Sequence, residues 1–219
     1  MPVQMKDRRL REISGVMSIR IGGVIAAVLL ACSAASSLAA GDPAAGQQKS
    51  AACGACHGPD GNSINPMWPM LAGQHVEYTK KQLEDFQAKR RENAQMSPMA
   101  APLSEQDISD VSAYFASQKM KTGTTAPEQM DLGQRLYRAG NAKNGLPACM
   151  ACHGPNGAGN PAAVYPALHG QHAVYTAAQL KAFKAEQRAN DPNGVMRDIA
   201  VKMSNAEIDA VSSYIQGLR

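Results

Sequence analysis

A five-residue pattern that occurs twice constrains this chain more than any other feature. Residues 53–57 read Cys-Gly-Ala-Cys-His, and residues 149–153 read Cys-Met-Ala-Cys-His. This is the attachment signature of a c-type haem, in which the two thiols add to the vinyl groups of one haem and the adjacent His reaches its iron. We therefore expect two covalently bound haem c groups, with these attachment and axial residues: Cys53, Cys56, Cys149, Cys152, His57 and His153.

Other interpretations of a Cys-x-x-Cys pair explain less. A disulfide, a redox dithiol and half of a zinc site all use two such thiols, but none of them needs a His directly after the second Cys. A zinc ribbon also wants its two cysteine pairs about 15–20 residues apart. Cys56 and Cys149 are much farther apart than that, so the haem interpretation is favoured.

The sequence around the motifs is duplicated as well. Pro-x-Leu-x-Gly-Gln-His occurs at 69–75 and at 166–172, and the Ser, Ile and Tyr spacing of 104–114 returns at 204–214. A repeating unit of this length indicates two domains rather than a solenoid. We expect an N-terminal domain at 40–121 and a C-terminal domain at 122–219, joined by a Thr- and Gly-rich linker near 121–126.

The first 39 residues have the layout of a secretory signal peptide. Arg20 precedes the apolar run 21–30, and small residues lead to Ala39. The run is too short to span a membrane, which disfavours a retained anchor. We expect cleavage after Ala39 and a periplasmic protein, with Met17 as an alternative start. Lipoprotein anchoring through Cys32 is the alternative that would tether the protein to the membrane.

The net charge gives no indication of a nucleic-acid partner. The first 39 residues hold five of the 22 basic and two of the 18 acidic residues, so the mature chain is near +1. A nucleic-acid-binding domain is expected to carry a clustered basic surface. Each half is also small and poor in aromatic residues, and a buried haem would supply the missing apolar core.

The chain is predicted to be all-α. No long strand pattern is present, and apolar residues recur at helical spacing. Ser104 and Ser204 begin the last helix of each half; the second has a full capping box, and the first has Asp in place of the usual Glu or Gln. The other predicted helices cover 42–52, 75–91, 127–139 and 172–190.

The sixth iron ligand is sought by comparing the two halves. Met96 and Met196 each lie eight residues before the Ser that begins the last helix, and no other pair of methionines aligns. A thioether at the same place in both halves is what a Met ligand requires. Met99 remains an alternative, and so does bis-His ligation through the aligned residues His75 and His172.

Pro69 and Pro166 are candidates for orienting the axial His residues. A backbone carbonyl that accepts a hydrogen bond from the second ring nitrogen of an axial His fixes the orientation of the ring. A rigid turn before the following helix explains the two prolines equally well. His169 aligns with Ala72 and is expected to be a surface residue.

The mature chain resembles the cytochrome c4 family, secreted dihaem proteins built from two class I cytochrome c domains. The resemblance rests on both haem motifs, on Pro-x-Leu-x-Gly-Gln, on Leu-Ser-x-x-Asp-Ile-x-x-Val-x-x-Tyr-Phe-Ala-Ser-Gln-Lys at 103–119 and on Ser-Ser-Tyr-Ile-Gln-Gly-Leu at 212–218. It implies two tandem class I cytochrome c domains related by internal duplication. It also implies Met96 and Met196 as axial ligands and the carbonyls of Pro69 and Pro166 as partners of the axial His residues. Trp68, where the family often has Phe, and the N-terminal extension depart from the pattern.

The resemblance implies a periplasmic electron carrier, often loosely attached to the membrane. Its donor would be the cytochrome bc complex or another protein, and its acceptor a terminal oxidase. Met/His ligation fills both axial positions of each iron, which argues against an enzyme such as a dihaem peroxidase. A haem-bearing subunit of a larger membrane oxidoreductase is the other alternative.

Overall fold

The computed structural model describes residues 41–219, and these residues contain helices and no β-strand. Two isolated β-bridges, Asn141 with Leu146 and Asn160 with Tyr165, are the only extended pairings among them. The all-α prediction is therefore confirmed for the described residues. The N-terminal half contains α2 (Pro43–Lys49), α3 (Ala51–His57), α4 (Val76–Gln87), α5 (Met96–Ala100) and α6 (Glu105–Ser117).

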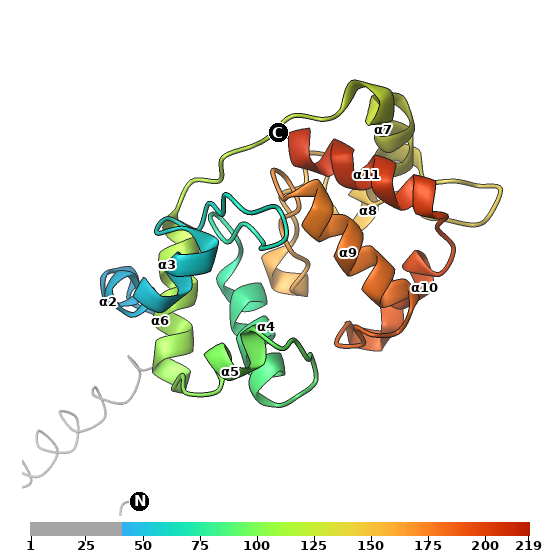
Figure 1. The fold of residues 1–219 in the computed structure, drawn as a ribbon. Coiled ribbons are helices and arrows are strands. Elements are labelled where there is room, and N and C mark those ends of the chain that lie inside the picture. The colour runs from blue at the N-terminus through green and yellow to red at the C-terminus, as the bar shows by residue number, and fades with distance from the viewer. Residues whose placement is uncertain (1–40) are drawn as a thin grey trace, which may run out of the picture. The chain divides into compact units, whose positions relative to one another are not determined.

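The C-terminal half repeats this order of elements (Figure 1). A short 3-10 turn leads into its first helix, two more such turns interrupt its loops, and its longest helix comes last, as α6 does in the first half. The elements are η2 (Pro127–Gln129), α7 (Met130–Ala139), α8 (Met150–His153), η3 (Pro161–Ala163), α9 (Ala173–Lys184), η4 (Pro192–Gly194), α10 (Val195–Ala200) and α11 (Asn205–Gly217).

In each half the first helix packs on the last, and a glycine lies where the two cross. A Cβ atom added at Gly46 of α2 would lie 2.0 Å from the Asp110 carbonyl oxygen of α6. A Cβ added at Gly133 of α7 would lie 2.4 Å from the Ala210 carbonyl oxygen of α11. Only glycine lets the two backbones approach this closely, so these residues set the distance between the helices.

The last helix of each half begins with a complete capping box. The Ser104 hydroxyl accepts from the Asp107 backbone N–H, and the Asp107 carboxylate accepts from the Ser104 N–H. Ser204 and Glu207 make the same reciprocal pair. Asp thus completes the box as Glu does, and both helices start where the sequence predicts. Behind the caps, each helix buries an apolar face, which includes Ile108, Val111 and Phe115 in α6 and Ile208, Val211 and Ile215 in α11.

The middle helices are shorter than predicted. The helix expected at 75–91 ends at Gln87, and the one expected at 172–190 ends at Lys184. After this helix, each half turns through a residue in the left-handed conformation, Lys89 in the first half and Glu186 in the second, both at φ 57°. The turn folds the following arginine of each half, Arg91 or Arg188, back towards its own helix. The helix expected at 42–52 is likewise divided at Ser50, where ψ is near 0°.

The segment between the halves is extended and is attached to both of them. The Lys121 N–H donates to the Asn62 side chain at 2.8 Å, and the Gly123 N–H donates to the Gln216 carbonyl at 3.1 Å. No helix within residues 41–219 is long and apolar enough to cross a membrane. The predictions for the signal peptide at 1–39, for Met17 and for Cys32 lie outside the residues that the structure describes.

Candidate functional site

The four cysteines of the repeated motifs form no disulfide and lie on or beside short helices. Cys53 and Cys56 lie on α3, one helical turn apart, so both side chains project from the same face. Cys149 is the N-cap of α8, and Cys152 lies within that helix. In each pair the first thiol is half-buried and the second is exposed.

The His residue that ends each motif is buried and hydrogen-bonded to a proline carbonyl. His57 Nδ1 lies 2.9 Å from the Pro69 carbonyl oxygen, and His153 Nδ1 lies 3.0 Å from that of Pro166. Because a carbonyl can only accept, the Nδ1 atoms carry the protons and the Nε2 atoms keep their lone pairs. Burial lowers the pKa of both rings although the carbonyl opposes this, so both are neutral near pH 7. A neutral imidazole oriented in this way can bind iron through Nε2.

The loops that supply the two carbonyls are held against their haem motifs by matching hydrogen bonds. The Leu71 N–H donates to the Gly61 carbonyl at 2.7 Å, and the Leu168 N–H donates to the Gly157 carbonyl at 2.7 Å. Gly61 and Gly157 follow the motifs in tight turns with φ of 74° and 73°. The turn residues of the sequence therefore bring each proline back over the His that precedes it by 12 or 13 positions.

The aligned methionines occupy the same region of both halves. Met96 is the first residue of α5 and Met196 lies in the first turn of α10, and both side chains are half-buried. Met99, the alternative, lies in the same short helix as Met96 but is 44% exposed. Met96 and Met196 remain the predicted axial ligands, each in the short helix that precedes the last helix of its half.

The alternative His ligands make contacts between the two halves. His75 Nε2 lies 2.7 Å from the Ala158 carbonyl oxygen, and His172 Nε2 lies 2.9 Å from that of Ser63. Their Nε2 atoms are therefore engaged by backbone of the opposite half. His169 Nδ1 lies 3.1 Å from the Gly157 carbonyl of its own half. This geometry disfavours bis-His ligation.

The donor set of each half fits one covalently attached haem. It consists of two cysteine side chains separated by two residues, a neutral His with a free Nε2, and a half-buried thioether farther along the chain. Thiols form the thioether links, and imidazole and thioether are ligands that suit a low-spin haem iron. The residues present therefore match the group that the motifs predict.

The sequence analysis missed a network of side chains between the two halves. Arg91 donates to Gln82 of its own half at 2.8 Å, and to Tyr175 at 3.0 Å and Gln179 at 2.9 Å in the other. The side chains that receive these bonds project from α4 and α9, which face each other in the middle of Figure 1.

Arg188 makes the mirrored set of contacts. It donates to Gln179 of its own half at 2.9 Å, and to Tyr78 and Gln82 of the other half, each at 3.0 Å. Each guanidinium also stacks on a phenylalanine of its own half, Phe86 or Phe183. The Tyr and Gln positions stand out in the sequence as repeated residues, but only the fold shows that they meet across the interface.

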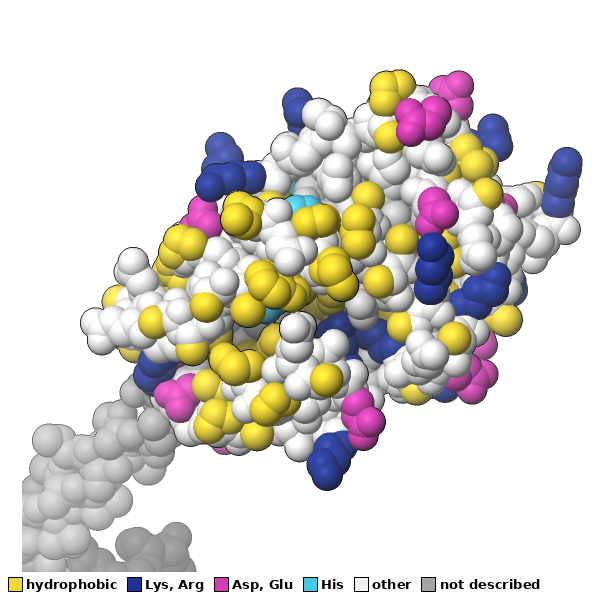
Figure 2. All heavy atoms as spheres, in the orientation of Figure 1, with side chains coloured by type: hydrophobic (Ala, Val, Ile, Leu, Met, Phe, Trp, Pro, Cys, Tyr) yellow, Lys and Arg dark blue, Asp and Glu magenta, His cyan; other side chains and the backbone are white. Residues whose placement is uncertain are grey.

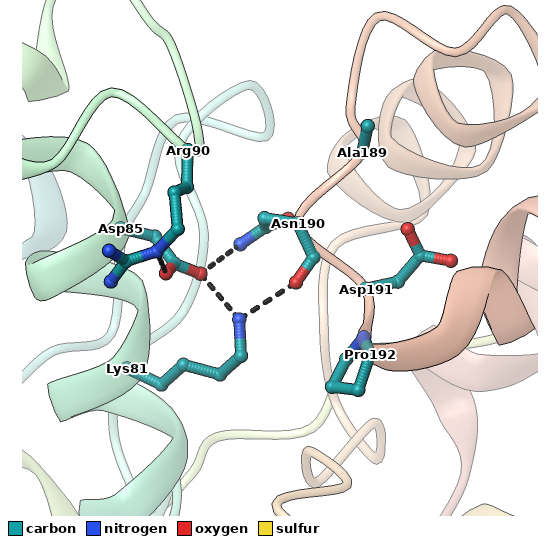
Figure 3. Close-up of a pocket in the computed structure, with 7 residues that line it drawn as sticks. All are labelled: Lys81, Asp85, Arg90, Ala189, Asn190, Asp191 and Pro192. Atoms are coloured by element: carbon teal, nitrogen blue, oxygen red, sulfur yellow. Dashed lines mark hydrogen bonds and ion pairs between the residues drawn. The ribbon is translucent and has the colours of Figure 1, made fainter.

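A further cluster at the interface has no copy in the other half. In the pocket of Figure 3, Lys81 Nζ donates to the Asp85 carboxylate and to the Asn190 carbonyl, and the Asn190 amide donates to Asp85 at 2.6 Å. Burial alone would raise the pKa of Asp85, but hydrogen bonds from Lys81, Asn190 and Arg90 outweigh it and lower the pKa. Ala178 and Ala182 occupy the positions equivalent to Lys81 and Asp85. The cluster of Lys81, Asp85 and Asn190 therefore occurs only once in the described residues.

Comparisons with known proteins match both halves. A family model described as "Cytochrome c" matches residues 43–119 and 130–219. Cytochrome c4 of Thiocapsa roseopersicina is 53% identical over 180 residues, which are 81% of this chain and 93% of that protein. A thiosulfate dehydrogenase electron acceptor of Thiomonas intermedia is 40% identical over 181 residues, 78% of this chain and 81% of that protein.

A solved structure has the same fold. The reduced recombinant cytochrome c4 from Pseudomonas stutzeri superimposes with a TM-score of 0.80 at 49% sequence identity. The match covers 82% of this chain and all of the other. The residues without a counterpart in it amount to about the length of the N-terminal segment that the structure does not describe.

Proposed function

Because this chain belongs to the cytochrome c4 family and carries two covalently attached haem c groups, we propose that each iron is held by one His and one Met. His57 pairs with Met96, and His153 pairs with Met196. The expected fold class, all-α with two tandem class I cytochrome c domains, is confirmed by the two family matches and the solved relative. The family membership also confirms the expectation of two haem c groups.

The protein is a dihaem electron carrier, as its cytochrome c4 relatives are. Haem supplies one-electron chemistry, and the chain holds it through thioether links and orients the axial His residues with the Pro69 and Pro166 carbonyls. We propose that Met96 and Met196 close both irons to exogenous ligands, so that the protein carries electrons and breaks no bonds. The single observation that supports this most is the equivalent placement of one thioether per half.

We further propose that the protein works in the periplasm, between the cytochrome bc complex and a terminal oxidase, with at most loose membrane association. The layout of residues 1–39 supports export. The described surface supports docking to a protein partner, because Ile64 and Met67 are 98% and 71% exposed. Figure 2 shows a face on which hydrophobic side chains gather with few charged ones among them. An exposed apolar surface of this kind is typical of a site of contact with another protein.

The name of one relative supports an alternative electron donor for this chain. The Thiomonas intermedia protein is named as the electron acceptor of a thiosulfate dehydrogenase. We propose such a dehydrogenase as an alternative donor to this chain. Permanent membership of a larger membrane oxidoreductase is the remaining alternative, and co-purification in detergent would distinguish it from a mobile carrier.

Stopped-flow spectroscopy tests the carrier function. The reduced protein is mixed with membranes that contain a terminal oxidase, and the haem absorbance is followed with and without cyanide. We expect rapid, cyanide-sensitive oxidation and no turnover when hydrogen peroxide replaces the membranes. Rapid peroxide turnover would instead identify a peroxidase, and oxidation that is no faster than in buffer would contradict an oxidase as the acceptor.

A further inference from the structure

One peptide group connects the axial His of the first half to a side chain of the second. The carbonyl of the Pro69–Met70 peptide accepts from His57 Nδ1 at 2.9 Å. The N–H of the same peptide, on Met70, donates to Gln171 Oε1 at 2.9 Å. The peptide therefore lies between an imidazole of one domain and an amide of the other.

The same arrangement occurs in the opposite direction. The Pro166–Ala167 peptide accepts from His153 Nδ1 at 3.0 Å through its carbonyl and donates to Gln74 Oε1 at 3.0 Å through its N–H. Each glutamine also uses its Nε2 to donate at 3.0 Å to the next carbonyl, on Met70 or Ala167. Each glutamine thus forms two hydrogen bonds with the backbone of one residue in the other domain, Gln171 with Met70 and Gln74 with Ala167.

These contacts are protected from water. Gln74 is 6% exposed and Gln171 is 7% exposed, and the gripped residues Met70 and Ala167 are buried too. In such surroundings a hydrogen bond is electrostatically stronger than in water, and bonds that share a polarisable group strengthen one another by about 10–30%.

A peptide transmits this effect because its N–H and its carbonyl share one resonance system. When the N–H donates to a glutamine oxygen, electron density shifts towards the carbonyl oxygen. That oxygen then accepts more strongly from Nδ1–H of the axial His, and the His becomes a stronger donor at Nε2. A more basic axial ligand stabilises ferric over ferrous iron and so lowers the reduction potential.

We propose that each domain tunes the haem of the other: Gln171 lowers the potential of the haem held by His57, and Gln74 lowers that of the haem held by His153. Both glutamines are positioning residues that act through a peptide and not on the iron. The proposal rests on His ligation from the proposed function. It assigns a role to the Gln of the repeated Pro-x-Leu-x-Gly-Gln motif. In both halves the side chain of this Gln contacts the other domain and not its own haem motif.

The test is a redox titration of the full dihaem protein with Gln171→Met. This change preserves the side-chain volume but removes both hydrogen bonds to Met70. Each potential is assigned to its domain by nuclear Overhauser contacts of the haem methyl groups in the reduced protein. We expect the potential of the N-terminal haem to rise and that of the C-terminal haem to move less. Gln74→Met should produce the converse pattern.

Two further variants separate tuning from a general loosening of the interface. Gln171→Glu keeps an acceptor for the Met70 N–H, so the potential of the N-terminal haem must not rise. His75→Leu removes the interdomain hydrogen bond to the Ala158 carbonyl but touches neither axial peptide, so both potentials should stay close to those of the wild type. In Gln171→Met, the Nδ1 proton of His57 should also move upfield as its hydrogen bond weakens.

Several results would overturn the proposal. In Gln171→Met or Gln74→Met, these are a change of potential confined to the haem of the mutated domain, or equal changes at both haems. A higher potential of the N-terminal haem in Gln171→Glu, or the same changes of potential in His75→Leu, would also overturn it. Unshifted potentials in a wild-type-like, low-spin Gln171→Met protein would overturn this inference and leave the proposed function intact. A wild-type spectrum without axial His would overturn both.

Discussion

At the scale of single residues, the methionine in each half decides whether the iron is closed. We expect Met96→Ala to abolish about half of the near-infrared sulfur-to-iron charge-transfer band of the oxidised protein, because only one of two thioether ligands is lost. The potential of that haem should fall, since a thioether favours ferrous iron over the water or nitrogen ligand that would replace it. Carbon monoxide binding to the reduced protein would report one open iron.

Met99→Ala is the matched control for this change. Met99 lies in the same short helix as Met96 but is exposed, so its loss should leave the band and the carbon monoxide titration unchanged. Loss of the band in Met99→Ala, or a wild-type spectrum of bis-His type, would contradict the assignment of Met96.

The buried carboxylate of Asp85 makes the interface sensitive to acid. Its pKa is lowered from 3.8 in the folded protein, so its contribution to stability is present above pH 3.8 and is lost as the pH falls through the folded value. We expect Asp85→Asn to destabilise the protein by about 1–3 kcal/mol at pH 7, because it replaces the carboxylate that pairs with Lys81 and Arg90 by a neutral amide with one acceptor oxygen fewer. The difference from wild type should shrink below pH 3.8.

Denaturant titrations of both proteins at pH 7 and pH 3 measure this difference. Asp209→Asn is the control, because Asp209 pairs with Lys181 where both side chains are about half exposed, and such a pair contributes about 0–1 kcal/mol. If the destabilisation by Asp85→Asn grew as the pH fell, the result would contradict a lowered pKa of Asp85 in the folded protein.

At the scale of elements, the crossing of the first and last helices depends on two glycines. We expect Gly46→Ala and Gly133→Ala each to lower the free energy of unfolding by about 1–3 kcal/mol, because the added methyl would overlap the backbone of the last helix. Gln47→Ala, at an exposed position of α2, should change the stability by about 0.5 kcal/mol or less. Stability of Gly46→Ala equal to that of Gln47→Ala would show that the helices can separate without cost.

The helix starts could be predicted, but two of the helix ends could not. Ser104 and Ser204 mark α6 and α11 because a cap is a local interaction within four residues. The ends of α4 and α9 depend on Lys89 and Glu186 in a left-handed conformation. Neither residue type favours that conformation, so nothing local in the sequence marks the turn. The arginines that follow each turn interact with the other domain, and this is visible only in the fold.

At the scale of the whole molecule, the duplication explains what the sequence could reveal about the site. The haem motifs, the prolines and the aligned methionines can be found because each half repeats them. The partners of Gln74 and Gln171 could not be found in this way, because a repeat shows which residues recur and not which residues meet. The cluster of Lys81, Asp85 and Asn190 was missed because its two charged residues do not recur: Ala178 and Ala182 stand at their positions in the other half.

The exported form of the molecule is predicted to begin at Ala40. The basic residue, apolar run and small residues of the first 39 positions predict removal of that segment. Intact mass and N-terminal sequencing of protein from the periplasmic fraction measure the start. A chain that begins at an acylated Cys32 would establish a membrane-tethered lipoprotein instead, and recovery of the full-length chain from the cytoplasm would contradict export.

The central claim is that this chain carries electrons through two haems that are both closed by His and Met. A redox titration of the purified protein, followed by optical spectra and scaled by a pyridine haemochrome assay, tests it most directly. We predict two acid-acetone-resistant haems per polypeptide, two reversible one-electron steps, and low-spin spectra at both ends of the titration. A single step, one haem per chain, or a high-spin haem that binds carbon monoxide in the wild-type protein would contradict the account.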